Sequence, residues 1–317
     1  MITSSGRDGA DLEARIGPIT LKNPVMTASG TYGYGNDIQP AATMARLGAV
    51  CTKGLSLKPR DGNPPPRIWE TASGMLNAIG LANMGMKRFL EDVLPDLKAQ
   101  GVTVVANIFG ECDDDFKALA AMVCGEEGIS ALELNISCPN VKKGGVLFGR
   151  DPALAAGITR NVIKASGLPV IVKLTPAAEN LLDVARAVEE AGACAVTAVN
   201  TFRGMAIDPE TGMPRLSTVI GGLSGPAIKP IALRMVYELY AGISIPIIAS
   251  GGIFSAADAL EYIMAGAVAV QTGTGNLIDP ATPFRVLDGI ADYCGKKQTS
   301  PAGLTGLTHR LVGSRRL

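Results

Sequence analysis

Short apolar runs alternate with amphipathic stretches along almost the whole chain. The stretches between the runs, such as 89–97, 116–123, 181–188 and 257–264, have the periodicity of surface helices. The runs themselves are continuous rather than alternating, which is typical of parallel strands covered on both faces. They lie at about residues 24–29, 49–53, 103–109, 130–137, 169–174, 195–200, 246–250 and 267–272. Eight β–α alternations predict an α/β fold, a (β/α)₈ TIM barrel, with an open doubly wound sheet as the alternative.

Two connections between predicted strands are much longer than the others. They span residues 54–82 and 202–225, and the first contains the run Pro64-Pro65-Pro66. Long connections in a compact domain are commonly lids or binding loops, so we expect both to lie over the C-terminal face of the barrel. No repeat or change of composition divides residues 1–317, which we interpret as one domain. Residues 296–317 show no strand–helix pattern and are expected to form a poorly ordered C-terminal tail.

Composition and charge exclude several classes of function. Hydrophobic residues make up 47% of the chain and charged residues 18%, which indicates a large core, while 29 basic residues balance 29 acidic ones. This balance argues against a nucleic-acid or anionic-membrane partner. The first fifteen residues lack the apolar centre of a signal peptide, and no run is long enough to span a bilayer. The six cysteines include no close pair, so we expect no metal site and a reducing, cytoplasmic location.

The end of each predicted strand carries polar or glycine residues. In a barrel these ends meet at the C-terminal face, where barrel enzymes keep their active sites. A single polar terminus is weak evidence, but eight together predict a site. The strand ends are Ser29-Gly30, Lys53-Gly54, Asn107, Asn135, Lys173, Asn200-Thr201, Ser250-Gly251-Gly252 and Thr272-Gly273-Thr274-Gly275.

The glycines after the seventh and eighth strands and two strand-end lysines favour an anionic ligand. Backbone N–H groups of Gly251-Gly252 and Gly273-Thr274-Gly275 could bind a phosphate, although ordinary βα turns also use glycine. Lys53 and Lys173 each end an apolar run, and a lysine there is costly unless an anion meets it. A structural salt bridge is the alternative for either lysine.

The segment Asn135-Ile-Ser-Cys-Pro-Asn140 is the most informative in the chain, because a buried strand has no packing reason to end in amides and a thiol. Asn77, Asn107, Asn135 and Asn200 could pair with a ring that carries imide and amide groups. The only histidine, His309, lies outside the strand–helix pattern, so Cys138 is the leading candidate for a catalytic base. Lysines at 142 and 143 could lower its pKa.

These segments together resemble the dihydroorotate dehydrogenase family over residues 16–295. Cys138 stands where the membrane-bound class of this family carries serine, and in this respect the chain resembles the soluble class 1. The loop Lys-Lys-Gly-Gly after Val141 resembles subclass 1B, the NAD-linked catalytic subunit. The matching motifs are Ala28-Ser-Gly30, Thr52-Lys-Gly54, Asn77-Ala-Ile-Gly-Leu81, Asn135-Ile-Ser-Cys-Pro-Asn140, Val172-Lys-Leu-Thr175, Val199-Asn-Thr201, Leu223-Ser-Gly-Pro226, Ser250-Gly-Gly-Ile253 and Gln271-Thr-Gly-Thr274.

The resemblance implies oxidation of (S)-dihydroorotate to orotate in pyrimidine biosynthesis, with Cys138 taking a proton from C5 while C6 gives hydride to N5 of FMN. It implies that the substrate is held by Lys53, Asn77, Ala78, Ile79, Gly80, Leu81, Asn107, Asn135, Asn200 and Thr201. It implies that FMN, one per chain, is held by Ser29, Lys53, Gly54, Asn107, Asn135, Lys173, Val199, Gly225, Gly251, Gly252, Gly273 and Thr274.

A partner subunit also follows from the resemblance to subclass 1B. That subunit would carry FAD and a [2Fe-2S] cluster and pass electrons to NAD⁺, in a heterotetramer of two catalytic and two electron-transfer chains around a homodimer core. Three alternatives stay open. They are a fumarate-linked class 1A enzyme, a dihydropyrimidine dehydrogenase-type barrel, and a non-redox phosphate-binding barrel such as an isomerase or aldolase.

Overall fold

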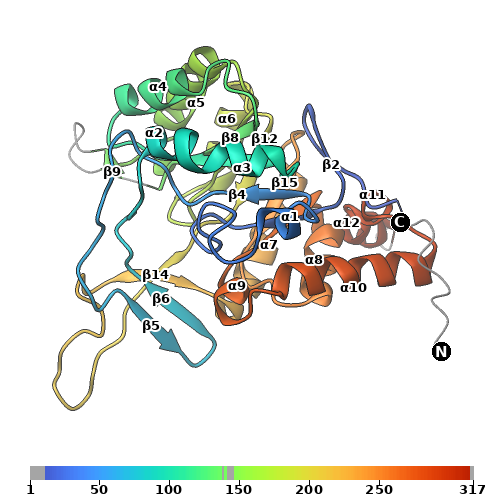
Figure 1. Ribbon diagram of the computed structural model, residues 1–317. Coiled ribbons are helices and arrows are strands. Elements are labelled where there is room, and N and C mark those ends of the chain that lie inside the picture. Colours follow the sequence, from blue (N-terminus) through green and yellow to red (C-terminus); the bar gives the residue numbers. More distant parts are fainter. Residues whose placement is uncertain (1–10, 138, 141–145, 315–317) are drawn as a thin grey trace, which may run out of the picture.

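Eight parallel strands close into a barrel in the computed structural model, which describes residues 11–137, 139–140 and 146–314 (Figure 1). The last strand pairs with the first, Val270 opposite Val25, so the sheet has no open edge. The predicted barrel is confirmed, and the open doubly wound sheet is excluded. In chain order the strands are β3 (Val25–Thr27), β4 (Ala49–Cys51), β7 (Val104–Ile108), β8 (Ile129–Asn135), β11 (Val170–Lys173), β12 (Ala195–Ala198), β15 (Ile247–Ser250) and β16 (Ala269–Thr272).

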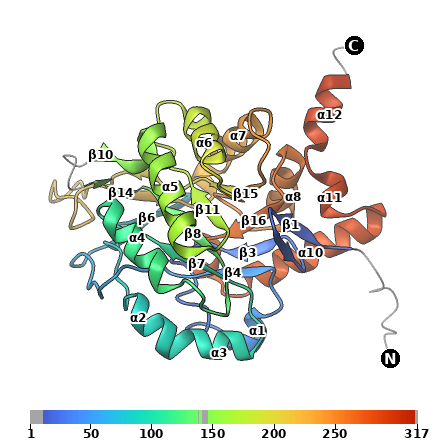
Figure 2. The same ribbon diagram turned by 90° about the horizontal axis from the view of Figure 1, so that it is seen from above.

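Helices surround this barrel, as the view from above shows (Figure 2). Local signals start several of them. Asp151 caps the helix after β8 by accepting the N–H groups of Ala153 and Leu154, and Ser255 and Asp258 form a capping box. The helices are α1 (Ala41–Met44), α2 (Met86–Arg88), the π-helix η1 (Phe89–Val93), α3 (Leu94–Ala99), α4 (Asp113–Met122), the 3₁₀ turn η3 (Phe148–Arg150), α5 (Pro152–Ser166), α6 (Leu181–Glu190), the 3₁₀ turn η4 (Pro226–Ile228), α7 (Lys229–Tyr240), α8 (Ala256–Ala265), α9 (Thr274–Ile278) and α10 (Thr282–Lys297).

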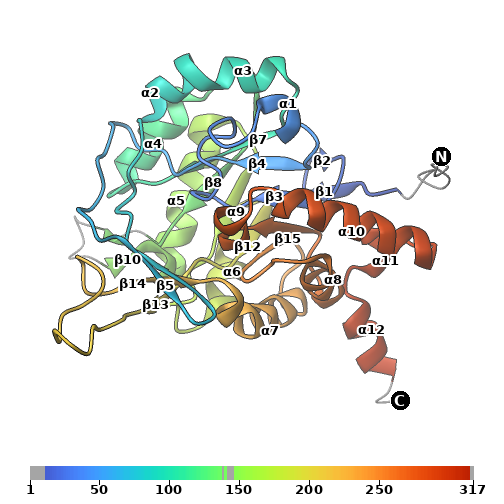
Figure 3. The same cartoon turned by 60° about the horizontal axis from the view of Figure 1, so that its bottom comes forward.

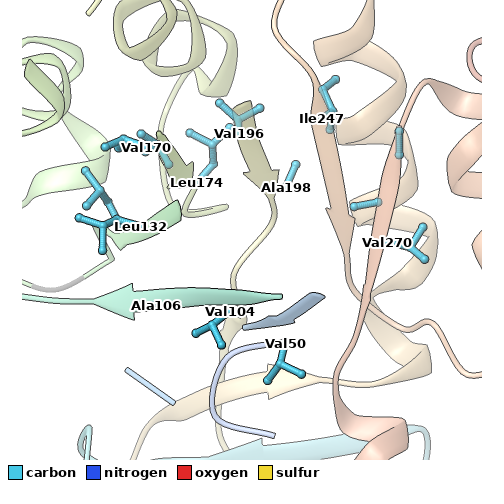
Figure 4. Close-up of a cluster of buried hydrophobic side chains, with 14 of the residues drawn as sticks. Val50, Val104, Ala106, Leu132, Val170, Leu174, Val196, Ala198, Ile247 and Val270 are labelled. Carbon is cyan, nitrogen blue, oxygen red and sulfur yellow. The ribbon is translucent and has the colours of Figure 1, made fainter. Parts of the chain in front are cut away.

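The two faces of each barrel strand serve different cores. One set of alternating side chains, including Val50, Val104, Leu132 and Val196, belongs to the large cluster between strands and helices (Figure 4). The intervening residues form a second cluster inside the barrel, made of Met26, Ala49, Cys51, Val105, Ala131, Ile171, Ala195, Ile248 and Ala269. Because strand side chains alternate, residues two positions further along these strands also face the interior, nearer the carboxyl ends.

A hairpin closes the amino-terminal end of the barrel. It consists of β1 (Ala14–Ile16) and β2 (Ile19–Leu21), which pair antiparallel. Ile16 and Leu21 are buried and belong to the interior cluster. The hairpin therefore leaves the carboxyl end as the open mouth.

The two long connections do not remain irregular loops. Their strands pair into one antiparallel sheet with the order β13 (Phe202–Gly204), β14 (Gly221–Ser224), β6 (Gly74–Asn77) and β5 (Ile68–Thr71). This sheet lies at the carboxyl end of the barrel, on the side opposite the β1–β2 hairpin, together with the gold excursion between β13 and β14 (Figure 3). A further two-residue ladder joins β9 (Pro139–Asn140) to β10 (Val146–Leu147).

The C-terminal segment contains helices α11 (Pro301–Leu304) and α12 (Leu307–Ser314), where the sequence analysis expects poor order. The difference arises because this segment is ordered by contacts with residues distant in the sequence. Leu304 is buried, and the His309 ring stacks on the ring of Tyr237 in α7, with 3.8 Å between the ring centroids. Among the described helices, none combines the length and apolar character needed to cross a bilayer.

Candidate active site

A cavity of about 460 Å³ opens at the carboxyl ends of the barrel strands, with the antiparallel sheet as one wall. Its volume is in the range of small-molecule and cofactor sites. Every residue that the resemblance implies for binding substrate or FMN lines it, namely Ser29, Lys53, Gly54, Asn77, Ala78, Ile79, Gly80, Leu81, Asn107, Asn135, Lys173, Val199, Asn200, Thr201, Gly225, Gly251, Gly252, Gly273 and Thr274. Cys138 lies outside the described residues.

A fully buried carboxylate lies inside the barrel beneath the cavity. Glu133 of β8 accepts hydrogen bonds from Asn107 Nδ2 at 2.7 Å, Thr197 Oγ1 at 2.7 Å and Gln271 Nε2 at 2.8 Å. Cys51 Sγ lies 3.1 Å from Oε1 of the same carboxylate. Burial alone would raise the pKa of Glu133, but the nearby Lys173 charge and the hydrogen bonds outweigh it and hold the pKa below its ordinary value. The carboxylate is therefore ionised.

Lys173 lies between this carboxylate and the cavity. Its Nζ donates to Gln271 Oε1 at 3.2 Å and lies 3.7 Å from Glu133 Oε1. Only 6% of the residue is exposed, and it also lines the cavity. Lys173 therefore has the structural ion pair that was one interpretation of the sequence, and it also lines the cavity, which the interpretation as a ligand-binding cation requires.

The floor of the cavity also contains an unsatisfied acceptor. Asn107 Oδ1 is buried and has no hydrogen-bond partner among the described residues. A Cβ added at Gly54 would lie 3.1 Å from this oxygen, so the glycine leaves room beside it. A buried acceptor without a partner costs free energy, and a ligand N–H would satisfy it. A flavin ring with an imide N–H fits this floor.

Glycines shape the opposite end of the cavity. Gly225, Gly251 and Gly252 have φ values of 97°, 140° and 68°, a region that disfavours side chains. A Cβ at Gly252 would lie 2.9 Å from Gly225 O. The neighbouring Lys229 is neutralised by Asp258 at 2.5 Å and Glu261 at 2.8 Å. A phosphate here would depend on backbone N–H groups, for which this close-packed glycine cradle is suited.

Amides and hydroxyls surround the space between floor and mouth. Asn200 Nδ2 donates to Ser137 Oγ at 2.9 Å, and the Thr201 N–H donates to Asn200 Oδ1 at 2.8 Å. Asn77, the last residue of β6, donates from Nδ2 to Gly222 O of β14 at 3.3 Å, a contact within the antiparallel sheet. These contacts hold Asn77 and Asn200 in place at the wall of the cavity.

Two cations line one side of the mouth. Lys53 follows β4, and its pKa is lowered by partial burial and by the positive charge of Arg67, while Asp37 acts in the opposite direction. Arg67 also lines the cavity, and its Nη1 donates to Asn63 O at 3.3 Å. A pair of like charges at one wall is suited to a carboxylate ligand.

Sequence reasoning missed Arg67 and the residues beneath the floor. Arg67 lies in a loop without a motif signal. The sequence does carry a signal for Glu133, because burying a carboxylate inside the apolar run 130–137 costs free energy for the same reason as burying Lys53 or Lys173. Thr197 and Gln271, also inside strands, become meaningful only once the barrel brings them to Glu133.

Comparison with known proteins agrees with this geometry. The family model described as Dihydroorotate dehydrogenase matches residues 11–293. A protein of Solidesulfovibrio magneticus is 50% identical over 282 residues, covering 88% of this chain and 92% of the relative. A protein of Trichlorobacter lovleyi is 47% identical over 286 residues, covering 90% and 94%. Both relatives are named Dihydroorotate dehydrogenase B (NAD(+)), catalytic subunit. The chain belongs to the dihydroorotate dehydrogenase family.

Proposed function

We propose that this chain binds FMN in the cavity and oxidises (S)-dihydroorotate to orotate, a step of pyrimidine biosynthesis. The observation that carries the proposal is a single cavity with a glycine cradle at one end, a lysine–carboxylate floor and a ring of asparagines. The cradle suits a phosphate, and the floor suits the ring of a flavin. When bound, FMN supplies the acceptor for a hydride.

The chain's own residues hold the substrate in this proposal. Lys53 would meet the substrate carboxylate, assisted by the backbone of residues 77–81, which lines the same wall. Asn77, Asn107, Asn135, Asn200 and Thr201 would orient the ring through its amide and imide groups. The antiparallel sheet would keep water from the reacting atoms.

Cys138 would take the proton from C5 of dihydroorotate. It follows Ser137, whose Oγ accepts a hydrogen bond from Asn200, a residue that lines the cavity. The support for this role comes from its place in the sequence motif and from His309 lying on the C-terminal helix α12, stacked on Tyr237. A thiolate can act as a general base when its pKa is lowered.

Electrons would leave through a partner subunit that carries FAD and a [2Fe-2S] cluster, with NAD⁺ as the final acceptor. The relatives' names include both NAD(+) and "catalytic subunit", which supports a partner for this chain. We propose a heterotetramer of two catalytic and two electron-transfer chains around a homodimer core, working in the cytoplasm.

The test is made on the purified chain. We expect a yellow protein that releases FMN on denaturation and whose flavin is bleached by dihydroorotate without oxygen. Alone, it should reduce artificial acceptors but use NAD⁺ poorly. A colourless preparation that takes up no FMN would contradict the flavin function. Efficient NAD⁺ reduction by the isolated chain would contradict the partner subunit.

A further inference from the structure

Glu133 has no part in the proposed reaction, yet it is a buried charge directly beneath the ligand space. We infer that Glu133 is a positioning residue, whose carboxylate orients Asn107 and Lys173 so that the cavity floor presents one acceptor and one donor to the imide edge of a flavin. This inference rests on the proposed binding of FMN. It adds a role for a residue that makes no contact with the ligand itself.

The first step concerns the orientation of Asn107. Its Nδ2 donates to Glu133 Oε1 at 2.7 Å, which leaves Oδ1 as the atom without a partner among the described residues. Turning the amide over would bring its oxygen against a carboxylate oxygen, and two acceptors repel. The carboxylate therefore determines that Asn107 offers an acceptor, and not a donor, to the cavity.

The second step concerns Lys173. Glu133 Oε2 accepts from Gln271 Nε2 at 2.8 Å, so the oxygen of that amide is the atom left for Lys173 Nζ, which donates to it at 3.2 Å. Thr197 Oγ1 also donates to Oε2, at 2.7 Å, and helps to hold the carboxylate in place. An ammonium group has three N–H bonds. Gln271 and Glu133 occupy two directions around Lys173 Nζ, so one of its three N–H bonds is left to donate into the cavity.

An acceptor beside a charged donor matches a particular ring edge. The only ring N–H of an oxidised isoalloxazine is its imide N–H, which lies between two carbonyl groups. Asn107 Oδ1 would accept that N–H, and Lys173 would donate to the adjoining polar edge. The charge of Lys173 favours negative charge on the reduced ring, and the charge of Glu133 partly offsets it.

The test uses Glu133→Gln, which keeps the shape of the side chain and removes its charge. One of its two terminal atoms becomes a donor, so Asn107 or Gln271 must turn or lose its bond. We expect flavin-free E133Q to bind FMN at least tenfold more weakly, measured by flavin fluorescence. The equilibrium constant for reduction of the bound flavin should also rise at least tenfold. This corresponds to a reduction potential about 30 mV higher for a two-electron couple.

Cys51→Ala is the matched control, because it removes a different contact to the same carboxylate and leaves Asn107 and Lys173 in place. We expect its dissociation constant for FMN to stay within threefold of the wild-type value. The equilibrium constant for reduction of its bound flavin should also stay within threefold of the wild-type value. A purely structural role for Glu133 would lower the unfolding temperature but leave the potential unchanged. Wild-type affinity and potential in a folded E133Q protein would overturn the inference.

A second measurement covers the case in which E133Q does not fold. The wild-type protein is titrated with FMN and with FMN methylated at the imide nitrogen. If Asn107 is held as an acceptor, the methylated compound should bind at least tenfold more weakly. Equal affinities would overturn the inference while leaving FMN binding intact. A wild-type protein that binds neither compound would overturn the proposed function together with the inference.

Discussion

The substitution Gly222→Ala should separate substrate binding from flavin binding. Gly222 lies on β14 and lines the cavity, and its carbonyl accepts the hydrogen bond from Asn77 Nδ2. A Cβ there would lie 2.3 Å from Thr201 Oγ1 and 2.9 Å from Thr201 Cβ. The hydroxyl can rotate, but the position of the threonine Cβ is set by the main chain. Either β14 or the segment after β12 must therefore move.

The size of the effect follows from this overlap. Forcing one methyl group into a packed site costs about 1–3 kcal/mol. We expect that strain to weaken the contacts of Asn77 and Thr201 with the substrate. Because about 1.4 kcal/mol of binding free energy corresponds to a factor of ten in affinity, KM for dihydroorotate should rise by about 5- to 150-fold. Gly251, Gly252 and the Glu133 network lie on other elements. Gly225 follows β14, but the pairing of Leu223 and Ser224 with β6 separates it from the overlap at Gly222, so the FMN content should stay close to the wild-type level.

Steady-state kinetics with an artificial acceptor, together with flavin content per chain, measure both quantities. Gly157→Ala is the control, since a methyl group at Gly157 in α5 would meet no atom within 4 Å apart from the neighbouring backbone of its own helix. It should leave KM unchanged and the helix slightly more stable. A wild-type KM in a G222A protein would refute the idea that the antiparallel sheet holds the substrate contacts in register.

Three further predictions concern the base, the phosphate end and the mouth. Cys138→Ser should slow flavin reduction by dihydroorotate by about 10²- to 10⁴-fold with FMN still bound, and an unchanged stopped-flow rate would remove Cys138 from its role. Gly252→Ala places a Cβ 2.9 Å from Gly225 O at a φ of 68°, so FMN affinity should fall at least roughly tenfold; fluorescence titration showing wild-type affinity would contradict the phosphate cradle. Burial and the charge of Arg67 lower the pKa of Lys53, so kcat/KM should fall at alkaline pH as Lys53 loses its proton. Arg67→Met removes a like charge, raises that pKa and should move the alkaline limb of the pH profile to higher pH; a limb at the same pH would show that Lys53 is not the titrating group.

The sequence alone determined the barrel and most of the cavity lining. Each barrel strand is a local apolar run, and its polar end is adjacent in the chain, so both are visible without knowing the pairing. Parallel strands bring all their carboxyl ends to one face. Once the strands were recognised, Lys53, Asn107, Lys173 and the glycines after β15 had to converge. The proposed role of Cys138 takes no support from the placement of its own side chain, because Cys138 lies outside the described residues.

Only the tertiary structure decided which polar residues meet. Glu133, Thr197 and Gln271 come from strands far apart in the chain and form one network because alternate side chains of a closed barrel share its interior. The antiparallel sheet likewise joins β6 to β14, about 145 residues later in the sequence. Such pairings depend on which distant segments come together, and the local pattern of one segment does not identify its partner.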